Sequence, residues 1–275
     1  MAYANYEHNG RCYVGEVDGS HLIPLAGITE IGPDTPTEVL EAAERLVQDK
    51  VAADDVKMRP VSPRAGKIIC VGLNYKSHIE ETKRDLPTYP VMFPKYASSL
   101  IGPNDDIILP PEGRQVDYEG ELAVVIGRGG RRITEENAPD HVLGYSVCND
   151  VTVRDYQYKT HQWMQGKAWD NSTPIGPWIV TPGEVDLTAA GISTTLNGQV
   201  VQKSDLSCLI FSIGRLIATV SEFTTLEPGD IILTGTPSGV GYRRDPQLFL
   251  HDGDTVTVEI EGVGSITNKV VAETI

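Results

Sequence analysis

The sequence predicts a strand-rich α+β fold, arranged as a mixed β-sandwich, roll or distorted barrel with few helices. From Lys67 onward the chain is a succession of short apolar runs, most of them broken by glycine or proline. The residues before Lys67 have a different pattern, which combines two short runs of alternating apolar and polar residues with one longer amphipathic stretch. We therefore expect a small N-terminal α/β module at residues 1–60 and a larger domain at residues 64–275.

The N-terminal module begins with a predicted hairpin. Apolar and polar residues alternate in residues 11–17 and 21–25, which flank the turn signal Asp-Gly-Ser. The polar stretch 51–66 contains two prolines and a glycine, which is typical of a linker.

A helix is predicted for residues 35–50. Thr35 is its candidate N-cap, Pro36 takes the first helical position, and Glu38 would complete a capping box with Thr35. The expected apolar stripe consists of Val39, Ala42, Ala43, Leu46 and Val47.

The larger domain contains many strand candidates and few helices. The predicted strands lie within residues 67–75, 105–110, 121–127, 141–150, 174–181, 230–237, 255–264 and 265–274. The predicted helices are residues 77–85, 151–158 and 206–223, of which the last has an apolar stripe at helical spacing.

The composition is that of an ordinary soluble globular protein, with 40% hydrophobic and 22% charged residues. The 23 basic and 38 acidic residues give a formal net charge of −15. Nucleic acid and anionic membrane surfaces are therefore not expected as partners. An anionic small molecule would need local cations or a metal ion in order to bind. No export signal opens the chain and no apolar run approaches a membrane span, so we expect a cytoplasmic protein.

Two glutamates stand at the start of a strongly apolar run. Glu119 and Glu121 are two positions apart in DYEGELAVVIG, so in a strand they share one face. The run that follows suggests a strand covered on both faces, where two unneutralised carboxylates would be costly. Asp150 ends another predicted strand and adds a third carboxylate, while Lys167 follows in a glycine-flanked setting. Three carboxylates with open positions suit Mg²⁺ or Mn²⁺ better than zinc.

His78 and Glu81 form a second candidate pair. Three positions apart on a helix, they share a face, and the carboxylate can orient the imidazole. The same spacing also occurs on charged surface helices. A metalloprotease-like zinc site does not fit, because Thr82 stands where the second histidine would be required.

Two glycine-rich stretches invite a ligand-binding interpretation. Residues 127–132, GRGGRR, lack the Lys-Ser/Thr ending of a phosphate loop and predict a hairpin loop instead. Residues 234–241, TGTPSGVG, follow a predicted strand and could cradle a carboxylate, although such a loop is also an ordinary turn.

Taken in order, these motifs closely resemble the fumarylacetoacetate hydrolase family. The resemblance covers roughly residues 64–270 and rests on GLNYKSHIEE, FPKYASSLIGPNDDIILP, DYEGELAVVIG, GYSVCNDVTVRD, QGKAWDNSTPIGPWIVT and ILTGTPSGVG. It is greatest with the shorter bacterial members that act on acylpyruvates, fumarylpyruvate, oxaloacetate or related 2-oxo diacids. It implies a mixed β-roll and a homodimer.

The resemblance also implies roles for individual residues. It assigns Glu119, Glu121 and Asp150 to a site for Mg²⁺ or Mn²⁺, His78 and Glu81 to a water-activating dyad on a lid-like segment, and Lys167 to stabilisation of developing negative charge. It assigns substrate contacts to Tyr75, Lys95, Gly235 and Thr236. One departure lies in KAWD, where Ala168 and Trp169 replace the Ser or Thr and the Phe of many members and put substrate identity in doubt.

The function expected from this resemblance is metal-dependent hydrolysis of a C–C bond in 2,4-dioxo acids of acylpyruvate or fumarylpyruvate type, in the breakdown of aromatic or related compounds. In this mechanism His78, oriented by Glu81, deprotonates a water molecule that attacks the 4-carbonyl. Alternatives at the same metal site are oxaloacetate decarboxylation and isomerisation of the 2-hydroxyhepta-2,4-diene-1,7-dioate type. A non-catalytic ligand-binding protein of the same fold is the alternative from another class.

The far end of the substrate pocket is less well defined by sequence. Residues 89–93 and 242–249 are candidates for lining it. Within the second stretch, Arg243 and Arg244 are candidate partners for a distal carboxylate, although arginines in a polar loop are usually solvated.

Overall fold

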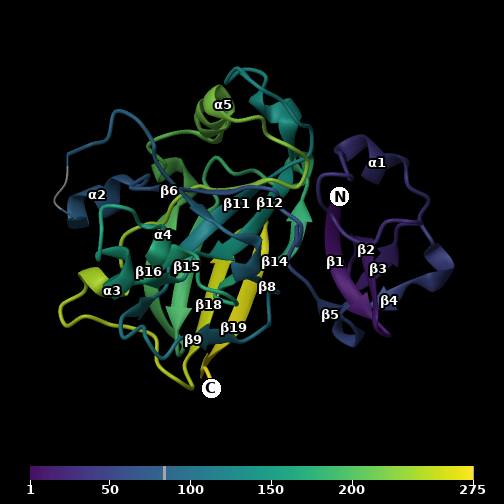
Figure 1. Ribbon diagram of the computed structural model, residues 1–275. Coiled ribbons are helices and arrows are strands. Elements are labelled where there is room, and N and C mark those ends of the chain that lie inside the picture. The colour runs from purple at the N-terminus through teal and green to yellow at the C-terminus, as the bar shows by residue number, and fades with distance from the viewer. Residues whose placement is uncertain (83–84, 275) are drawn as a thin grey trace.

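The computed structural model describes residues 1–82 and 85–274, and it shows a strand-rich α+β fold built on one large mixed sheet (Figure 1). The order of ten strands across this sheet is β4-β3-β2-β1-β14-β12-β11-β17-β6-β7, while β5 pairs with β1 and β8 with β14. Its strands are β1 Ala2–His8, β2 Arg11–Asp18, β3 His21–Pro24, β4 Val51–Ala52, β5 Lys57–Met58, β6 Ile68–Gly72, β7 Val91–Lys95, β8 Leu100–Ile101, β11 Gly120–Ile126, β12 Val142–Asn149, β14 Thr173–Val180 and β17 Ile231–Leu233.

A second sheet packs against the first. Its strand order is β16-β15-β18-β19-β9, and a separate two-stranded ladder joins β10 to β13. These strands are β9 Ile107–Leu109, β10 Val116–Asp117, β13 Thr152–Val153, β15 Gly191–Leu196, β16 Gln199–Asp205, β18 Thr255–Ile260 and β19 Gly264–Ala272. The eight strands predicted from sequence in the larger domain are all confirmed, whereas the β15–β16 hairpin was not predicted.

Strand β11 is buried along its whole length, as the apolar run predicts. Leu122 and Val124 belong to the core between the two sheets, together with Val258 of β18. Ala123 and Val125 point to the opposite face and pack in the core that also holds Leu25 of the N-terminal segment. A strand with apolar cover on both faces carries the candidate metal ligands at its N-terminal end.

The predicted N-terminal hairpin is confirmed, since β2 and β3 pair in antiparallel fashion. Strand β1 pairs with β2 on one side and with β14 on the other, where Tyr3 lies opposite Ile179. The N-terminal strands therefore extend the large sheet at one end, seen in purple in Figure 1.

The helices are short, and they are α1 Thr37–Ala42, α2 Lys76–Thr82, α3 Arg154–Gln157, α4 Met164–Lys167 and α5 Ile213–Phe223. The prediction for 77–85 is met by α2 as far as residue 82, and residues 83–84 lie outside the described residues. The prediction for 206–223 begins too early, because Ser212 caps α5 by accepting a hydrogen bond from the Arg215 N–H.

The prediction of one helix over 35–50 is wrong. Thr35 does not cap α1, because its hydroxyl bonds to the backbone of Gly32 instead. The helix ends at Ala42, and the Arg45 guanidinium then donates to the carbonyl oxygens of Leu40, Glu41 and Ala43. The expected apolar stripe is also absent from α1, whose buried side chain is Leu40.

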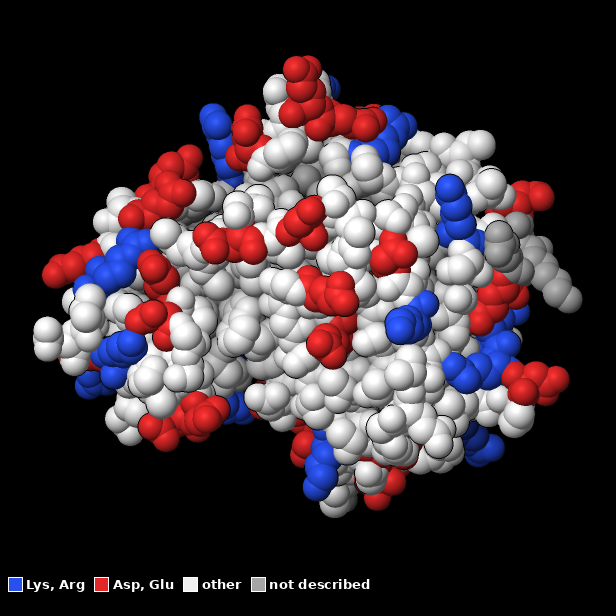
Figure 2. Space-filling model, turned by 180° about the vertical axis from the view of Figure 1, so that it is seen from behind, with Lys and Arg blue, Asp and Glu red and all other residues white. Residues whose placement is uncertain are grey.

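Charged side chains on the face shown in Figure 2 are predominantly acidic and spread across its width, with basic ones set mainly toward the edges. This distribution agrees with the net charge of −15. Among the described residues, no helix is long and apolar enough to cross a membrane.

The attachment of the N-terminal strands to the following segment leads to a first prediction. Asn5 in β1 is fully buried; its side-chain amide donates to the Val61 carbonyl (2.6 Å), and its oxygen accepts from the Ile31 N–H (2.9 Å). Replacing Asn5 with alanine should lower the free energy of unfolding by about 1–3 kcal/mol, because two buried backbone groups lose their partners. Urea unfolding measures this change, and Asn104→Ala, at an exposed asparagine, is the control. Equal effects of the two substitutions would contradict the prediction.

Candidate active site

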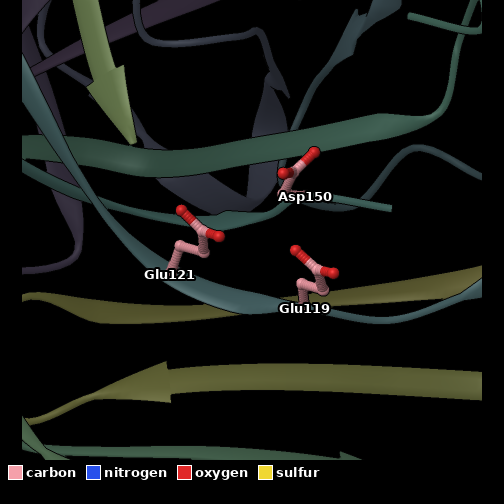
Figure 3. Close-up of side chains that lie close together, drawn as sticks. All are labelled: Glu119, Glu121 and Asp150. Carbon is pink, nitrogen blue, oxygen red and sulfur yellow. The ribbon is translucent and has the colours of Figure 1, made fainter. Parts of the chain in front are cut away.

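Strand pairing brings three carboxylates together. In the β11–β12 ladder Gly120 lies opposite Asn149, so Glu119 lies opposite Asp150, and the Asp150 N–H donates to the Glu119 carbonyl (2.8 Å). Glu121 shares a face with Glu119 because strand side chains alternate. Figure 3 shows the three carboxylates turned toward one another, and one oxygen of each lies within 4.8 Å of one oxygen of every other.

Three buried cations surround this carboxylate triad, which we define as Glu119, Glu121 and Asp150. The ammonium group of Lys167, the last residue of α4, lies 2.7 Å from Glu119 Oε2 and 2.7 Å from Asp150 Oδ2. The Lys95 ammonium group lies 2.7 Å from the other Asp150 oxygen.

Arg154 is the third cation and begins α3. Its guanidinium lies 2.7 Å from Glu119 Oε1 and 2.8 Å from Asp117 Oδ2, and it also donates to the Gln157 side chain (3.0 Å). Arg154 therefore connects the triad to a fourth buried carboxylate, that of Asp117.

These contacts determine the charge of Glu119. Burial opposes its ionised form, but the adjacent Lys167 and Arg154 outweigh burial and lower the pKa of Glu119 to about 2. The pKa of Lys167 is correspondingly raised, because Asp150 and Glu119 outweigh the effect of burial on the ammonium group.

Glu121 differs from Glu119 and Asp150, because it forms no ion pair with any described residue. Its Oε2 accepts one hydrogen bond, from the Gly235 N–H (2.8 Å). Burial, together with the neighbouring Asp150 and Glu119, raises the pKa of Glu121 well above its usual value. Four buried carboxyl groups thus face three buried cations, and Glu121 is the one whose ionised form has no cation partner among the described residues.

His78 and Glu81 form the predicted pair on α2. His78 Nδ1 lies 3.1 Å from Glu81 Oε2, and Glu81 Oε1 accepts from the Gly239 N–H (3.0 Å). The Nδ1 contact leaves Nε2 as the ring nitrogen that can exchange a proton with a ligand. Glu81 also fixes α2 to the loop that follows β17.

That loop, TGTPSGVG, contacts the triad strand directly. The Thr236 hydroxyl donates to the Gly120 carbonyl (3.0 Å) and accepts from the Gln202 amide (2.8 Å). The Gln202 carbonyl oxygen in turn accepts from the Gly120 N–H (2.9 Å) and the Thr194 hydroxyl (2.8 Å). This buried network holds the loop in register with the residue between Glu119 and Glu121.

One cavity gathers these groups. Its lining includes two of the three triad carboxylates together with His78, Arg154, Gln157, Lys167 and Thr236. The lining also includes apolar and aromatic side chains and one more cation, namely Val71, Leu73, Phe93, Tyr158, Trp163, Val240, Tyr242 and Arg243. A cavity in which charged groups converge beside apolar and aromatic side chains suits a small-molecule ligand.

The residues present fit a divalent cation. The three triad ligands offer carboxylate oxygens alone, which are the donors that hard cations prefer. A divalent cation would also neutralise the uncompensated charge of Glu121. We therefore treat the triad as a candidate metal centre.

The chain matches the family model described as fumarylacetoacetate (FAA) hydrolase C-terminal over residues 67–271, which include every element of this site. The chain belongs to the fumarylacetoacetate hydrolase family. The resemblance seen in the sequence motifs and the strand-rich fold expected from it are both confirmed.

The chain is similar to family relatives that have different activities in their names. The mitochondrial oxaloacetate tautomerase fahd2 of Xenopus laevis is 42% identical over 267 residues, covering 92% of this chain and 84% of the relative. The crystal structure of 5-carboxymethyl-2-hydroxymuconate delta-isomerase from Mycobacterium smegmatis is 37% identical, with a TM-score of 0.85 and coverage of 99% and 100%. The fumarylacetoacetate hydrolase of Exiguobacterium antarcticum is 35% identical, with a TM-score of 0.84 and the same coverage.

The structure brings together most of the family-site residues named from sequence. Glu119, Glu121, His78, Lys167 and Thr236 line the cavity. Other predicted residues contact these without lining the cavity. Asp150 pairs with Lys167 and with Lys95, Glu81 holds His78, and the Gly235 N–H binds Glu121.

Among the described residues, Tyr75 is the predicted substrate contact that neither lines the cavity nor binds a triad carboxylate. It is fully buried, and it is not among the described residues that line the cavity. Its hydroxyl has no hydrogen-bond partner among the described residues. Burial and the nearby Glu121 raise the pKa of this hydroxyl. Trp169 is the unusual residue of the KAWD motif. It packs edge-on against Tyr156 and is not among the described residues that line the cavity.

Sequence reasoning missed several residues of this site. Arg154, Asp117 and Gln157 form one buried cluster with Glu119, and Gln202 lies on an unpredicted strand. Arg154 and Asp117 both stand within quoted motifs, and each adjoins a strand end next to a triad ligand. Their position beside those strand ends marks them as candidates, but their contacts with Glu119 and with the Gly241–Arg243 turn follow only from the tertiary structure.

Proposed function

We propose that the chain is an enzyme that tautomerises, or moves a double bond in, a 2-oxo acid, and that it works with Mg²⁺ or Mn²⁺ held by the carboxylate triad. The observation that carries the proposal is the uncompensated Glu121 carboxylate in the same cavity as the oriented His78–Glu81 pair. The names of the Xenopus laevis tautomerase and the Mycobacterium smegmatis isomerase support isomerisation over hydrolysis. The hydrolysis expected from sequence is therefore the second candidate.

Both reactions require negative charge to develop on the 2-oxo oxygen. A bound divalent cation would supply Lewis acidity to that oxygen and to the adjacent carboxylate. Lys167 offers a fixed positive charge at the same end of the cavity, held in place by its two carboxylate partners.

His78 is the proposed proton-transfer group. Its Nε2 would remove a proton from the carbon next to the 2-oxo group and later return a proton at another position, so that no bond of the carbon skeleton breaks. Glu81 would act as a positioning residue, since it holds Nδ1 and is itself held by the Gly239 N–H.

The remaining substrate-binding assignments are also proposals. Thr236 would contact the substrate directly, because its side chain lines the cavity. Gly235 and Lys95 would act through Glu121 and Asp150, to which they are bonded. Tyr75 would contribute its buried hydroxyl, which has no hydrogen-bond partner among the described residues, near Glu121.

Hydrolysis remains a specific second candidate for two reasons. The solved structure from Exiguobacterium antarcticum is named a fumarylacetoacetate hydrolase. In addition, a histidine oriented by a carboxylate can activate a water molecule as readily as it can accept a carbon-bound proton.

The test compares the products formed from two substrates with and without EDTA. Loss of the enol absorbance of oxaloacetate without pyruvate formation is expected for the proposed tautomerisation. Pyruvate formed from oxaloacetate would indicate decarboxylation, and pyruvate formed from an acylpyruvate would indicate hydrolysis. Enol loss no faster than in buffer, or enzymatic activity that survives complete chelation, would contradict the proposal.

The same assay tests His78. His78→Ala is expected to lower kcat by about 10²–10⁴-fold, since this is the usual contribution of a general acid–base group. His251→Ala is the matched control, because the His251 side chain is 77% exposed. Wild-type turnover in His78→Ala would exclude His78 as the proton-transfer group.

A further inference from the structure

The outer rim of the active-site cavity contains a cation that the proposed proton transfer does not use. Tyr242 and Arg243 of the short 3₁₀ turn Gly241–Arg243 both line the cavity, and Arg243 is exposed, which places it at the outer rim. Tyr242 packs against Tyr158 with ring centroids 5.1 Å apart, and the Arg243 guanidinium carbon lies 5.2 Å from the Tyr242 ring centroid. The cavity therefore has an acidic inner end, an aromatic wall and an arginine at its mouth.

Arg243 differs from the other cations of this cavity in having no carboxylate partner. Arg154 and Lys167 are both paired with Glu119. Among the described residues Arg243 forms no ion pair, although the chain has 15 more acidic than basic residues. The neighbouring Arg244 is used structurally, because it donates to the carbonyl oxygens of Gly239 and Val201.

The turn that carries Arg243 is fixed relative to the triad. Asp117 Oδ1 accepts from the Gly241 N–H (2.8 Å), and Asp117 Oδ2 accepts from the Tyr242 N–H (3.0 Å). The same carboxylate pairs with Arg154, which pairs with Glu119. The buried carboxylate of Asp117 thus fixes the position of the Gly241–Arg243 turn relative to Glu119 at the inner end of the cavity.

We propose that Arg243 binds a second carboxylate, at the end of the substrate away from the triad, and so makes the site selective for dianionic 2-oxo acids. The inference rests on the proposed function, because it takes the triad as the site of the 2-oxo end. The positive charges at the inner end are already matched by carboxylates, so a second substrate charge needs a cation of its own. Arginine is suited to this task because its planar guanidinium can bind a carboxylate through two hydrogen bonds.

The test measures equilibrium binding to the full chain with Mg²⁺, and it does not depend on turnover. Three ligand pairs of equal carbon number differ only at the far end, where the diacid has a carboxylate and the monoacid a methyl group. The pairs are oxaloacetate with 2-oxobutanoate, 2-oxoglutarate with 2-oxopentanoate, and 2-oxoadipate with 2-oxohexanoate. We expect the diacid to bind about tenfold more tightly or better in at least one pair, as one charge-assisted contact would provide.

Arg243→Gln is expected to reduce that preference to about one while leaving pyruvate binding unchanged, since pyruvate occupies the inner end alone. Arg243→Lys should retain part of the preference, because it keeps the charge and loses the fork of donors. Arg64→Gln is the matched control, because it removes the same charge from a side chain that is 57% exposed and outside the cavity lining.

Two results would overturn the inference. One is the absence of any diacid preference in the wild type, and the other is a preference that survives in Arg243→Gln. A preference that is lost in Arg243→Gln, in a protein that shows neither enol loss nor pyruvate formation, would uphold the inference about Arg243 and refute the proposed function.

Discussion

Replacing Glu121 with glutamine is expected to abolish cation-dependent activity while leaving the metal-free protein at least as stable as the wild type. Glu121 is buried without an ion pair among the described residues, so its ionised form is costly in the absence of a cation. Glutamine has the same shape, carries no charge, and can keep the hydrogen bond from the Gly235 N–H. A group that destabilises the empty site and is needed for activity would be a metal ligand.

Two measurements, the activity of Glu121→Gln and the effect of metal ions on its Tm, test this prediction separately. We expect kcat/KM to fall by about 10³-fold or more, because a metal ion that polarises a carbonyl supplies several kcal/mol of transition-state stabilisation. The rise in Tm that Mg²⁺ or Mn²⁺ produces in the wild type should also be lost, as binding to the folded state is what stabilises it. Glu259→Gln on β18 is the control, since it makes the same substitution at an exposed strand position. A Glu121→Gln protein that retains both the metal-induced rise in Tm and its activity would show that Glu121 is not a ligand.

The triad could be predicted from sequence because it follows from local rules. Strand alternation places Glu119 and Glu121 on one face, and the apolar run shows that the face is buried. Asp150 required one further step, which is the antiparallel pairing of two successive strands. Two of these rules act within one strand and the third between two neighbouring strands, so the tertiary structure added little to the carboxylates themselves.

The neutralising cations could not be predicted in the same way. Arg154 and Lys167 reach Glu119 from two short helices, each of four residues, whose positions depend on packing around the cavity. Asp117 precedes Glu119 by two positions, but its bonds to the Gly241 and Tyr242 N–H groups join segments more than 120 residues apart. Such contacts are set by the tertiary structure and not by a sequence period.

Two predictions about secondary structure were incomplete or wrong, and each has an identifiable cause. The β15–β16 hairpin contains the dipeptide Asn197-Gly198, whose residues both have positive φ, and this is a strong hairpin signal that went unused. The helix predicted for 35–50 fails because Arg45 binds the last helical carbonyl oxygens and pairs its backbone with Leu25. In that segment a side chain and a tertiary bridge override the periodic pattern.

Replacing Lys167 with methionine should lower the free energy of unfolding of the metal-free protein by about 3–5 kcal/mol, the usual cost of removing one partner from a buried ion pair. Lys167 is 1% exposed and is bonded to both Glu119 and Asp150, so its loss would leave two buried carboxylates short of one cation. Urea unfolding in EDTA measures this change. Lys50→Met is the control, because Lys50 pairs with Asp18 at a similar distance (2.6 Å) on the surface, where such pairs contribute little.

Adding Mg²⁺ should restore part of the stability lost in Lys167→Met, because a cation bound by the triad would compensate the same two carboxylates. Activity should stay low at Mg²⁺ concentrations that restore stability, since a metal ion cannot replace the separate positive charge that Lys167 holds beside the substrate. Activity that recovered together with stability would instead mean that Lys167 acts only by neutralising the triad. A Lys167→Met protein as stable as the wild type in EDTA would contradict the premise that this ammonium group balances the buried charge. The paired measurement therefore separates the electrostatic support of the metal centre from a direct role in the reaction.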